Sequence, residues 1–281
     1  MFDRLVSVAR KHVRHSGRPG LLPRWVTHAD YKSFQAWLRR APTPPSLAYG
    51  AEYLAEVERN GICIVPDFWS AEKCADARAE IDRVITEYPR YVNGNAKADV
   101  RVYGANNASA LIDDFAQDAR LLAIASAYNH KATETAFTLA ARMPTTPGNS
   151  GSGEGWHRDA FLRQFKAILY LSEVSMENGP FQFLSDSQRS KRVLVDMKTA
   201  DLKYMQYRME ETQIARLLAQ EPARLKTFTA RAGTLILVDT SAIHRGKPIQ
   251  AGTRYALTNY YFPTDSIDQS MYEKFDVLPR A

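Results

Sequence analysis

The spacing of apolar positions changes along the chain, from helical in its first half to alternating in its second. Before residue 130, apolar side chains recur every three or four positions, which predicts amphipathic helices. Helices are expected at residues 51–60, after Ser70 as an N-cap, and at about 111–128. From residue 134 onward the period is mainly two, as in half-buried strands. Strands are predicted at 62–65, 100–103, 135–142, 165–171, 181–184, 234–239 and 254–262.

Three segments interrupt the alternating strands. Glycines gather in the loop at 147–155, where they permit either a mobile gate or a simple flexible connection. The pair Asn178-Gly179 predicts the tip of a hairpin that joins 165–171 to 181–184. A helical insertion is expected at about 197–220. The fold class is therefore mostly β with flanking helices, an antiparallel sandwich or barrel with helices packed outside it.

The prolines at 42, 44 and 45 divide the chain into a basic N-terminal helical arm, residues 1–48, and a single domain, residues 49–281. The core strands of that domain are expected at about 134–262. The apolar positions of the arm follow a helical stripe, with basic residues largely off it. The stripe either packs on the domain or rests on an anionic membrane surface.

The net charge of +6 belongs to the arm. Residues 1–40 hold nine Lys or Arg against two acids, so the remainder, 28 basic minus 29 acidic residues, sums to −1. This distribution argues against a nucleic-acid partner for the domain. With two cysteines and no apolar run of about 20 residues, neither a disulfide framework nor a membrane span is expected. We expect a cytoplasmic protein, peripheral to the inner face of the membrane if the arm binds lipid.

One short motif carries chemistry. His157 and Asp159 are separated by a single residue, so on an extended segment their side chains point to one face and Arg158 points away. His244 follows a predicted strand, and sheet pairing could bring it beside the pair. Two imidazoles and one carboxylate can occupy one face of an Fe(II) octahedron, which leaves three positions open. A chance triplet and a structural histidine are the competing interpretation.

Arg254 begins the last predicted strand, ten residues after His244. A buried guanidinium needs an anion, and a carboxylate bound through two hydrogen bonds is its best partner. Alternation places Thr258 on the same face, where its hydroxyl could contribute. The alternative is an arginine at the start of a strand that forms a surface salt bridge.

From about Asn60 to Phe262 the sequence resembles the phytanoyl-CoA dioxygenase family of Fe(II)/2-oxoglutarate oxygenases. The motifs that carry the resemblance are Gly61 to Val65, Trp156-His157-Arg158-Asp159, Asn178-Gly179-Pro180-Phe181, His244-Arg245-Gly246 and Gly252-Thr253-Arg254-Tyr255. The resemblance implies a double-stranded β-helix, the cupin-like jelly roll. It implies iron ligation by His157, Asp159 and His244, and binding of the distal carboxylate of 2-oxoglutarate by Arg254. It also implies consumption of O2, conversion of 2-oxoglutarate to succinate, and hydroxylation of an unactivated C–H bond.

The sequence departs from the family pattern at Gly246, where several members have a serine that contacts the same carboxylate. Thr258 or Thr253 could substitute for it. Arg142 corresponds to positions where relatives contact 2-oxoglutarate or substrate. The substrate is expected to be a small molecule, or one linked to lipid or saccharide because of the basic arm. A non-catalytic cupin-like binding protein and a zinc hydrolase are the rival functions, and neither explains the complete set of four residues.

Overall fold

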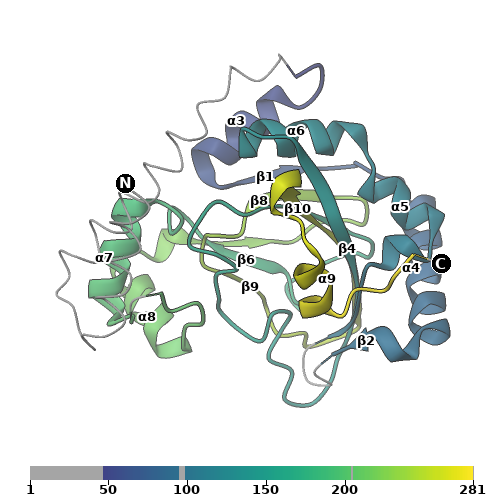
Figure 1. Ribbon diagram of the computed structural model, residues 1–281. Helices are drawn as coiled ribbons and strands as arrows, with labels where there is room; N and C mark the ends of the chain where they lie inside the picture. Colours follow the sequence, from purple (N-terminus) through teal and green to yellow (C-terminus); the bar gives the residue numbers. More distant parts are fainter. Residues whose placement is uncertain (1–46, 95–98, 204, 281) are drawn as a thin grey trace.

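The computed structural model describes residues 47–94, 99–203 and 205–280, so the predictions for the N-terminal arm lie outside the described residues. Two antiparallel sheets pack face to face (Figure 1). The seven-stranded sheet has the order β1-β8-β5-β10-β4-β3-β2, and the three-stranded sheet has the order β7-β6-β9. The strand bounds are β1 (Ile62–Val65), β2 (Val92–Asn93), β3 (Val100–Tyr103), β4 (Thr133–Pro144), β5 (Phe165–Tyr170), β6 (Phe181–Leu184), β7 (Leu225–Phe228), β8 (Leu235–Asp239), β9 (His244–Gly246) and β10 (Thr253–Pro263).

Helices cover the outer face of the large sheet and one end of the sandwich (Figure 1). Those on the sheet are α3 (Ala51–Asn60), α4 (Ala71–Glu87), α5 (Ala110–Ala116) and α6 (Ala119–Asn129). Those elsewhere are α7 (Ser190–Ala200), α8 (Glu211–Gln220) and α9 (Gln269–Phe275), with short 3-10 turns at Pro89–Tyr91, Ala105–Asn107, Pro222–Arg224 and Thr264–Ser266. The fold is a jelly roll with flanking helices, as the sequence predicts.

Local chemistry sets several helix ends. Ser70 caps α4, its side chain accepting from the backbone N–H of Lys73, as predicted. The single helix expected at about 111–128 is instead two, α5 and α6, because Asp118 begins a new helix by accepting from the backbone N–H groups of Arg120 and Leu121. The insertion expected at about 197–220 begins earlier, at Ser190, and also comprises two helices, α7 and α8.

The prediction of a hairpin at Asn178-Gly179 is wrong, because the two strands that it would join do not pair. β5 pairs with β8 and β10 in the large sheet, whereas β6 pairs with β7 and β9 in the small one. The segment between them therefore carries the chain from one sheet to the other. Asn-Gly favours a tight turn in either case, so local turn chemistry does not decide which strands pair.

The buried apolar residues form separate clusters, and the positions of these clusters determine where the site lies. The largest cluster fills the space between the large sheet and helices α3 to α6, with Ile81, Phe115 and Leu237 completely buried. A second cluster joins the two sheets through side chains of β1, β5, β6 and β8. A third packs α7 and α8 against the segment around Trp156. The helical insertion thus supports the segment that carries the first two predicted metal ligands.

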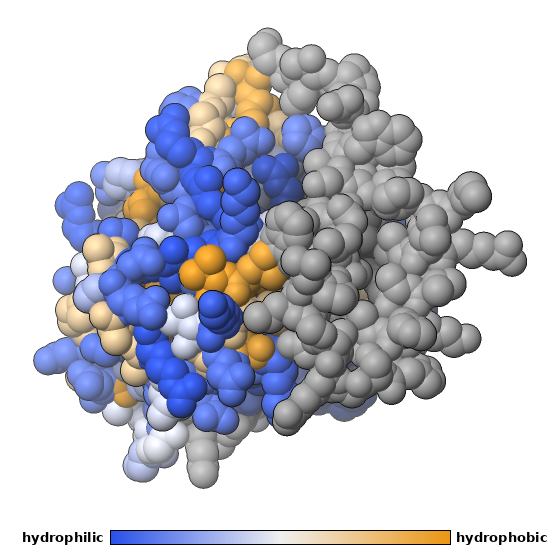
Figure 2. Space-filling view, turned by 90° about the vertical axis from the view of Figure 1, so that its left-hand side faces the viewer, coloured by the Kyte–Doolittle hydropathy of each residue, from blue (hydrophilic) through white to orange (hydrophobic). Residues whose placement is uncertain are grey.

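Where Figure 2 shows described residues, the surface over the left-hand side of Figure 1 is mostly hydrophilic, with apolar side chains grouped near its centre and at its upper edge. The large apolar side chains that are exposed among the described residues are Met176, Val195 and Tyr207. None of the helices in the described ranges is both long enough and apolar enough to span a membrane.

Candidate metal centre

The segment that carries His157 and Asp159 is held from two sides by backbone hydrogen bonds. His157 exchanges two bonds of 2.9 Å with His244, which confirms the predicted approach of the distal histidine. Arg158 donates to the Tyr207 carbonyl at 2.8 Å, from the connection between α7 and α8. Asp159 donates to the Thr240 carbonyl at 3.0 Å. The motif is therefore held by isolated β-bridges at His157 and by the flanking backbone hydrogen bonds, outside the named strands.

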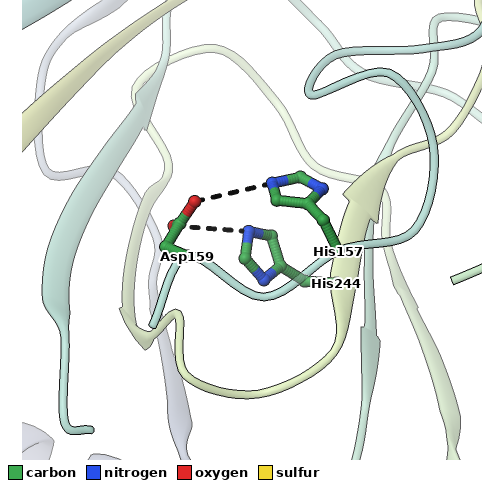
Figure 3. A group of neighbouring side chains, drawn as sticks. All are labelled: His157, Asp159 and His244. Carbon is green, nitrogen blue, oxygen red and sulfur yellow. Dashed lines mark ion pairs between the residues drawn. The ribbon is translucent and has the colours of Figure 1, made fainter. Parts of the chain in front are cut away.

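The three side chains converge on one point (Figure 3). His157 Nε2 lies 3.6 Å from Asp159 Oδ1, and His244 Nε2 lies 3.6 Å from Asp159 Oδ2. One ligand atom from each residue lies within 4.8 Å of the others. Arg158 lies on the opposite side, where its guanidinium donates to the carbonyls of Ser187 and Ser241, so the predicted alternation holds.

Both imidazoles are held in the tautomer that a metal requires. Nδ1 of His157 lies 2.9 Å from the Gly155 carbonyl oxygen, and Nδ1 of His244 lies 2.9 Å from that of Ala242. Since a carbonyl can only accept, each Nδ1 carries the proton and each Nε2 offers a lone pair. Burial lowers the pKa of His157 and lowers that of His244 to about 3, so both rings are neutral near pH 7.

The carboxylate is held by a buried lysine that the sequence analysis missed. Lys166 Nζ donates to Asp159 Oδ2 at 2.8 Å and lies 3.6 Å from the centre of the Tyr260 ring. Burial alone raises the pKa of Asp159, but Lys166 and the two histidines lower it well below its usual range. Lys166 interrupts the apolar strand Phe165–Tyr170, and that lone charge among buried positions could have revealed it.

The triad opens into a cavity of about 540 Å³. One face of the large sheet lines it, with alternate residues of β3, β4, β5 and β10 pointing inward. Thr258 lies on this face beside Leu139 and Ile168, whereas Thr253 is exposed. Ser152 and Gly153 of the glycine-rich loop close the cavity on another side.

Arg254 is the clearest unsatisfied group in this cavity. Its side chain is buried, and Nε and Nη1 have no hydrogen-bond partner among the described residues. Nη2 lies 2.9 Å from Met143 Sδ. A buried guanidinium stays charged and is costly without an acceptor, so this position fits one end of a dicarboxylate. The donor set of two histidines and one carboxylate fits ferrous iron. The residues present thus fit both iron and 2-oxoglutarate.

Gly246 explains how the loop and Arg254 can approach so closely. A Cβ atom at this position would lie 2.8 Å from Arg254 Nη2 and 2.8 Å from Ser152 Cβ. The side chain of Ser152 therefore lies where a residue larger than glycine at position 246 would extend. Ser152 Oγ donates to Asp99 Oδ2 at 3.1 Å.

Arg142 does not reach the cavity. It neighbours Ala141 and Met143, which face the cavity, so alternation turns its side chain to the other face of the sheet. There its Nη1 lies 2.9 Å from Asp82 Oδ1 of α4. The structure thus corrects the placement of Arg142 in the site. The strand was predicted, but the face that points inward was not.

Three comparisons with known proteins bear on this centre. The family model described as Phytanoyl-CoA dioxygenase (PhyH) matches residues 57–254. A protein named ectoine dioxygenase from Nocardia farcinica is 22% identical over 246 residues, which cover 80% of each chain. Another of that name from Bordetella bronchiseptica is 21% identical over 218 residues, 70% of each chain.

Solved structures support the same fold. EctD from S. alaskensis, crystallised with 2-oxoglutarate and 5-hydroxyectoine, superposes with a TM-score of 0.61 at 17% identity, covering 80% of each chain. The epimerase SnoN, in complex with Fe3+, alpha ketoglutarate and nogalamycin RO, gives a TM-score of 0.57 at 17% identity. That match covers 81% of this chain and 89% of SnoN.

Proposed function

Because this chain belongs to the phytanoyl-CoA dioxygenase family, we propose that it is an Fe(II)/2-oxoglutarate-dependent dioxygenase that hydroxylates a C–H bond of a small molecule. The observation that carries the proposal is the orphaned guanidinium of Arg254 in the same cavity as the triad. A metal site alone would suit several chemistries. A buried cation without an acidic partner among the described residues specifies an anionic cosubstrate beside the metal.

Each residue has a role that follows from its contacts. His157 and His244 would hold the metal through Nε2, while their Nδ1–H groups fix the ring planes against Gly155 and Ala242. Asp159 would supply the anionic ligand, kept ionised and oriented by Lys166. When bound, iron and 2-oxoglutarate supply the oxidation, in which O2 and 2-oxoglutarate give succinate, carbon dioxide and one oxygen atom inserted into the substrate.

The cavity walls perform the remaining tasks of the protein. Arg254 would hold the distal carboxylate, which orients the cosubstrate relative to the metal. Ser152 and Gly153 cover the cavity from the loop and limit its contact with water. The relatives named ectoine dioxygenase suggest a small-molecule substrate. A lipid- or saccharide-linked substrate, membrane contact of the arm and a cytoplasmic location stay predictions.

The test is succinate formation from 2-oxoglutarate by the full chain with ferrous iron in air. We expect activity that needs iron and is lost in His157→Ala. Arg254→Ala should raise the 2-oxoglutarate requirement about 30-fold or more, since truncating one partner of a buried charge pair costs about 2 kcal/mol or more. Arg142→Ala is the matched control on the opposite face and should leave this requirement unchanged. No succinate under these conditions would contradict the activity and favour a non-catalytic binding module.

A further inference from the structure

We propose that the substrate is an anion with an apolar body, whose carboxylate, sulfate or phosphate group is received by Arg101 and Lys274 at the outer part of the cavity. This inference rests on the proposed function and names the class of molecule on which it acts. The two cations lie outside the set that iron and 2-oxoglutarate require.

The proposed position is where two cavities meet. Arg101, Tyr103, Lys274 and Phe275 line both the cavity that contains the triad and a smaller one of about 280 Å³. The first two belong to β3 and the last two to the C-terminal helix α9, which lies in front of β4 and β10 in Figure 1. A molecule that passes from the outer to the inner cavity would meet these four side chains.

Arg101 occupies a position in the cavity that is distinct from that of Arg254. The two arginines point from the same face of the sheet, but β4 lies between their strands and their registers differ by two residues, so their backbones are roughly 12 Å apart. Arg101 pairs in register with Ala141, which pairs in turn with Ala256. These small neighbours leave space above the sheet between the two guanidinium groups.

Arg101 is held in one orientation before any ligand arrives. Nε donates to Asp99 Oδ1 at 2.7 Å, Nη2 also contacts that oxygen, and Nη1 donates to the Tyr103 hydroxyl at 3.2 Å. These three contacts leave two of the five N–H groups of the guanidinium. The side chain is 19% exposed, against 1% for Asp99, so the arginine rather than the acid is the accessible partner.

Lys274 adds a cation that the described residues do not neutralise. It is exposed on α9, and no ion pair joins its ammonium to an acid within the described ranges. The other cations that line the inner cavity, apart from Arg254, have acidic partners. Lys166 pairs with Asp159 at 2.8 Å, and Arg208 lies 3.8 Å from Glu154. Asp268 also lines the inner cavity without an ion pair among the described residues, so it offsets one of the two unpaired cations, Arg254 and Lys274. Since Fe(II) and the 2-oxoglutarate dianion cancel in charge, the loaded cavity would keep a net positive charge.

An aromatic wall lies beside these cations. The rings of Tyr103, Phe137, Tyr260 and Phe275 all contact one another, with centroids 4.8 to 6.3 Å apart. All but Phe137 line the inner cavity. Phe275 fastens α9 to the sheet through these contacts, which places Lys274 at the opening. An apolar or flat body would pack on this wall with its anionic group toward Arg101 and Lys274.

The test compares two probes of nearly the same shape, naphthalene-2-sulfonate and its neutral sulfonamide. The full chain is loaded with ferrous iron and saturating 2-oxoglutarate without oxygen, so that Arg254 is occupied, and probe binding is followed by fluorescence. We expect the sulfonate to bind at least tenfold more tightly than the sulfonamide. Lys274→Gln should reduce sulfonate affinity severalfold and Lys274→Glu should remove the preference. Lys198→Gln, on the exposed side of α7, is the matched control and should change neither affinity.

Equal affinity for the two probes, or a preference that persists in Lys274→Glu, would overturn the proposal. Arg101→Lys provides a second variant that keeps the charge but loses the fork of donors, and it should weaken sulfonate binding without loss of folding. Binding of 2-oxoglutarate is recorded in the same samples. Anion preference without 2-oxoglutarate binding would therefore contradict the dioxygenase function alone, whereas the reverse result would contradict the substrate class alone.

Discussion

At the scale of single residues, the burial of His244 links the metal centre to the acid stability of the metal-free protein. Burial lowers its pKa from 6.5 to about 3 in the folded chain. Below about pH 6.5 the imidazole is protonated in the unfolded chain but stays neutral in the folded chain. The contribution of the neutral, buried His244 to the free energy of unfolding is therefore fully present above that pH. It is lost progressively as pH falls toward 3. Asp159, whose pKa is lowered from an already acidic value, titrates below this window.

Urea unfolding of the metal-free protein at pH 7 and pH 5 tests this linkage. The titration of His244 alone should lower the free energy of unfolding by about 2 kcal/mol between these two pH values. In His244→Asn the loss over the same interval should be smaller by about that amount, whatever the stability of the variant at pH 7. An identical pH dependence in both proteins would show that His244 is protonated in the folded state.

At the scale of elements, the glycine-rich loop positions a ligand rather than serving only as a connection. Gly153 has a φ of +79°, and a Cβ atom there would lie 2.2 Å from Cε1 of His157. Gly148 in the same loop has a φ of +73°, yet a Cβ atom there would meet nothing within 4 Å. Both positions need a backbone of positive φ, which favours glycine, but only at Gly153 would a side chain also contact the imidazole.

Gly153→Ala and Gly148→Ala therefore form a matched pair. Both should lose similar stability from the left-handed backbone, roughly 1 kcal/mol. Only Gly153→Ala should displace His157 and weaken iron binding, by tenfold or more, as measured by anaerobic calorimetric titration with ferrous iron. Equal iron affinity in the two variants would mean that the loop does not set the position of the imidazole.

The elements also show where sequence reasoning succeeds and fails. Alternation correctly placed His157 and Asp159 on one side and Arg158 on the other, because a strand offers only two faces. The family resemblance places Arg142 in the site, and alternation along β4 could not correct this because it does not tell which face points inward; in the structure Arg142 contacts Asp82. The Asn178-Gly179 turn was assigned to a hairpin because turn chemistry is local, whereas strand pairing is set by the whole sandwich.

At the scale of the whole molecule, the site exists because the jelly roll brings distant segments together. His157 and His244 become neighbours through one backbone bridge, and Arg254 enters the same cavity from β10 of the opposite sheet. Their residue types were visible in the sequence. The sequence analysis identified neither Lys166 nor Arg101. The lone charge in an apolar strand could have indicated Lys166, but the acidic partners of the two residues, Asp159 and Asp99, follow only from the fold.

For this protein to act as a dioxygenase, ferrous iron and 2-oxoglutarate must occupy this cavity together. The most direct measurement is an anaerobic titration of the iron-loaded chain with 2-oxoglutarate, followed by visible absorption. We expect a metal-to-ligand charge-transfer band that saturates at one 2-oxoglutarate per chain and is absent without iron. Absence of the band, or 2-oxoglutarate binding that is equally tight with and without iron, would contradict the assignment of this protein as an Fe(II)/2-oxoglutarate dioxygenase.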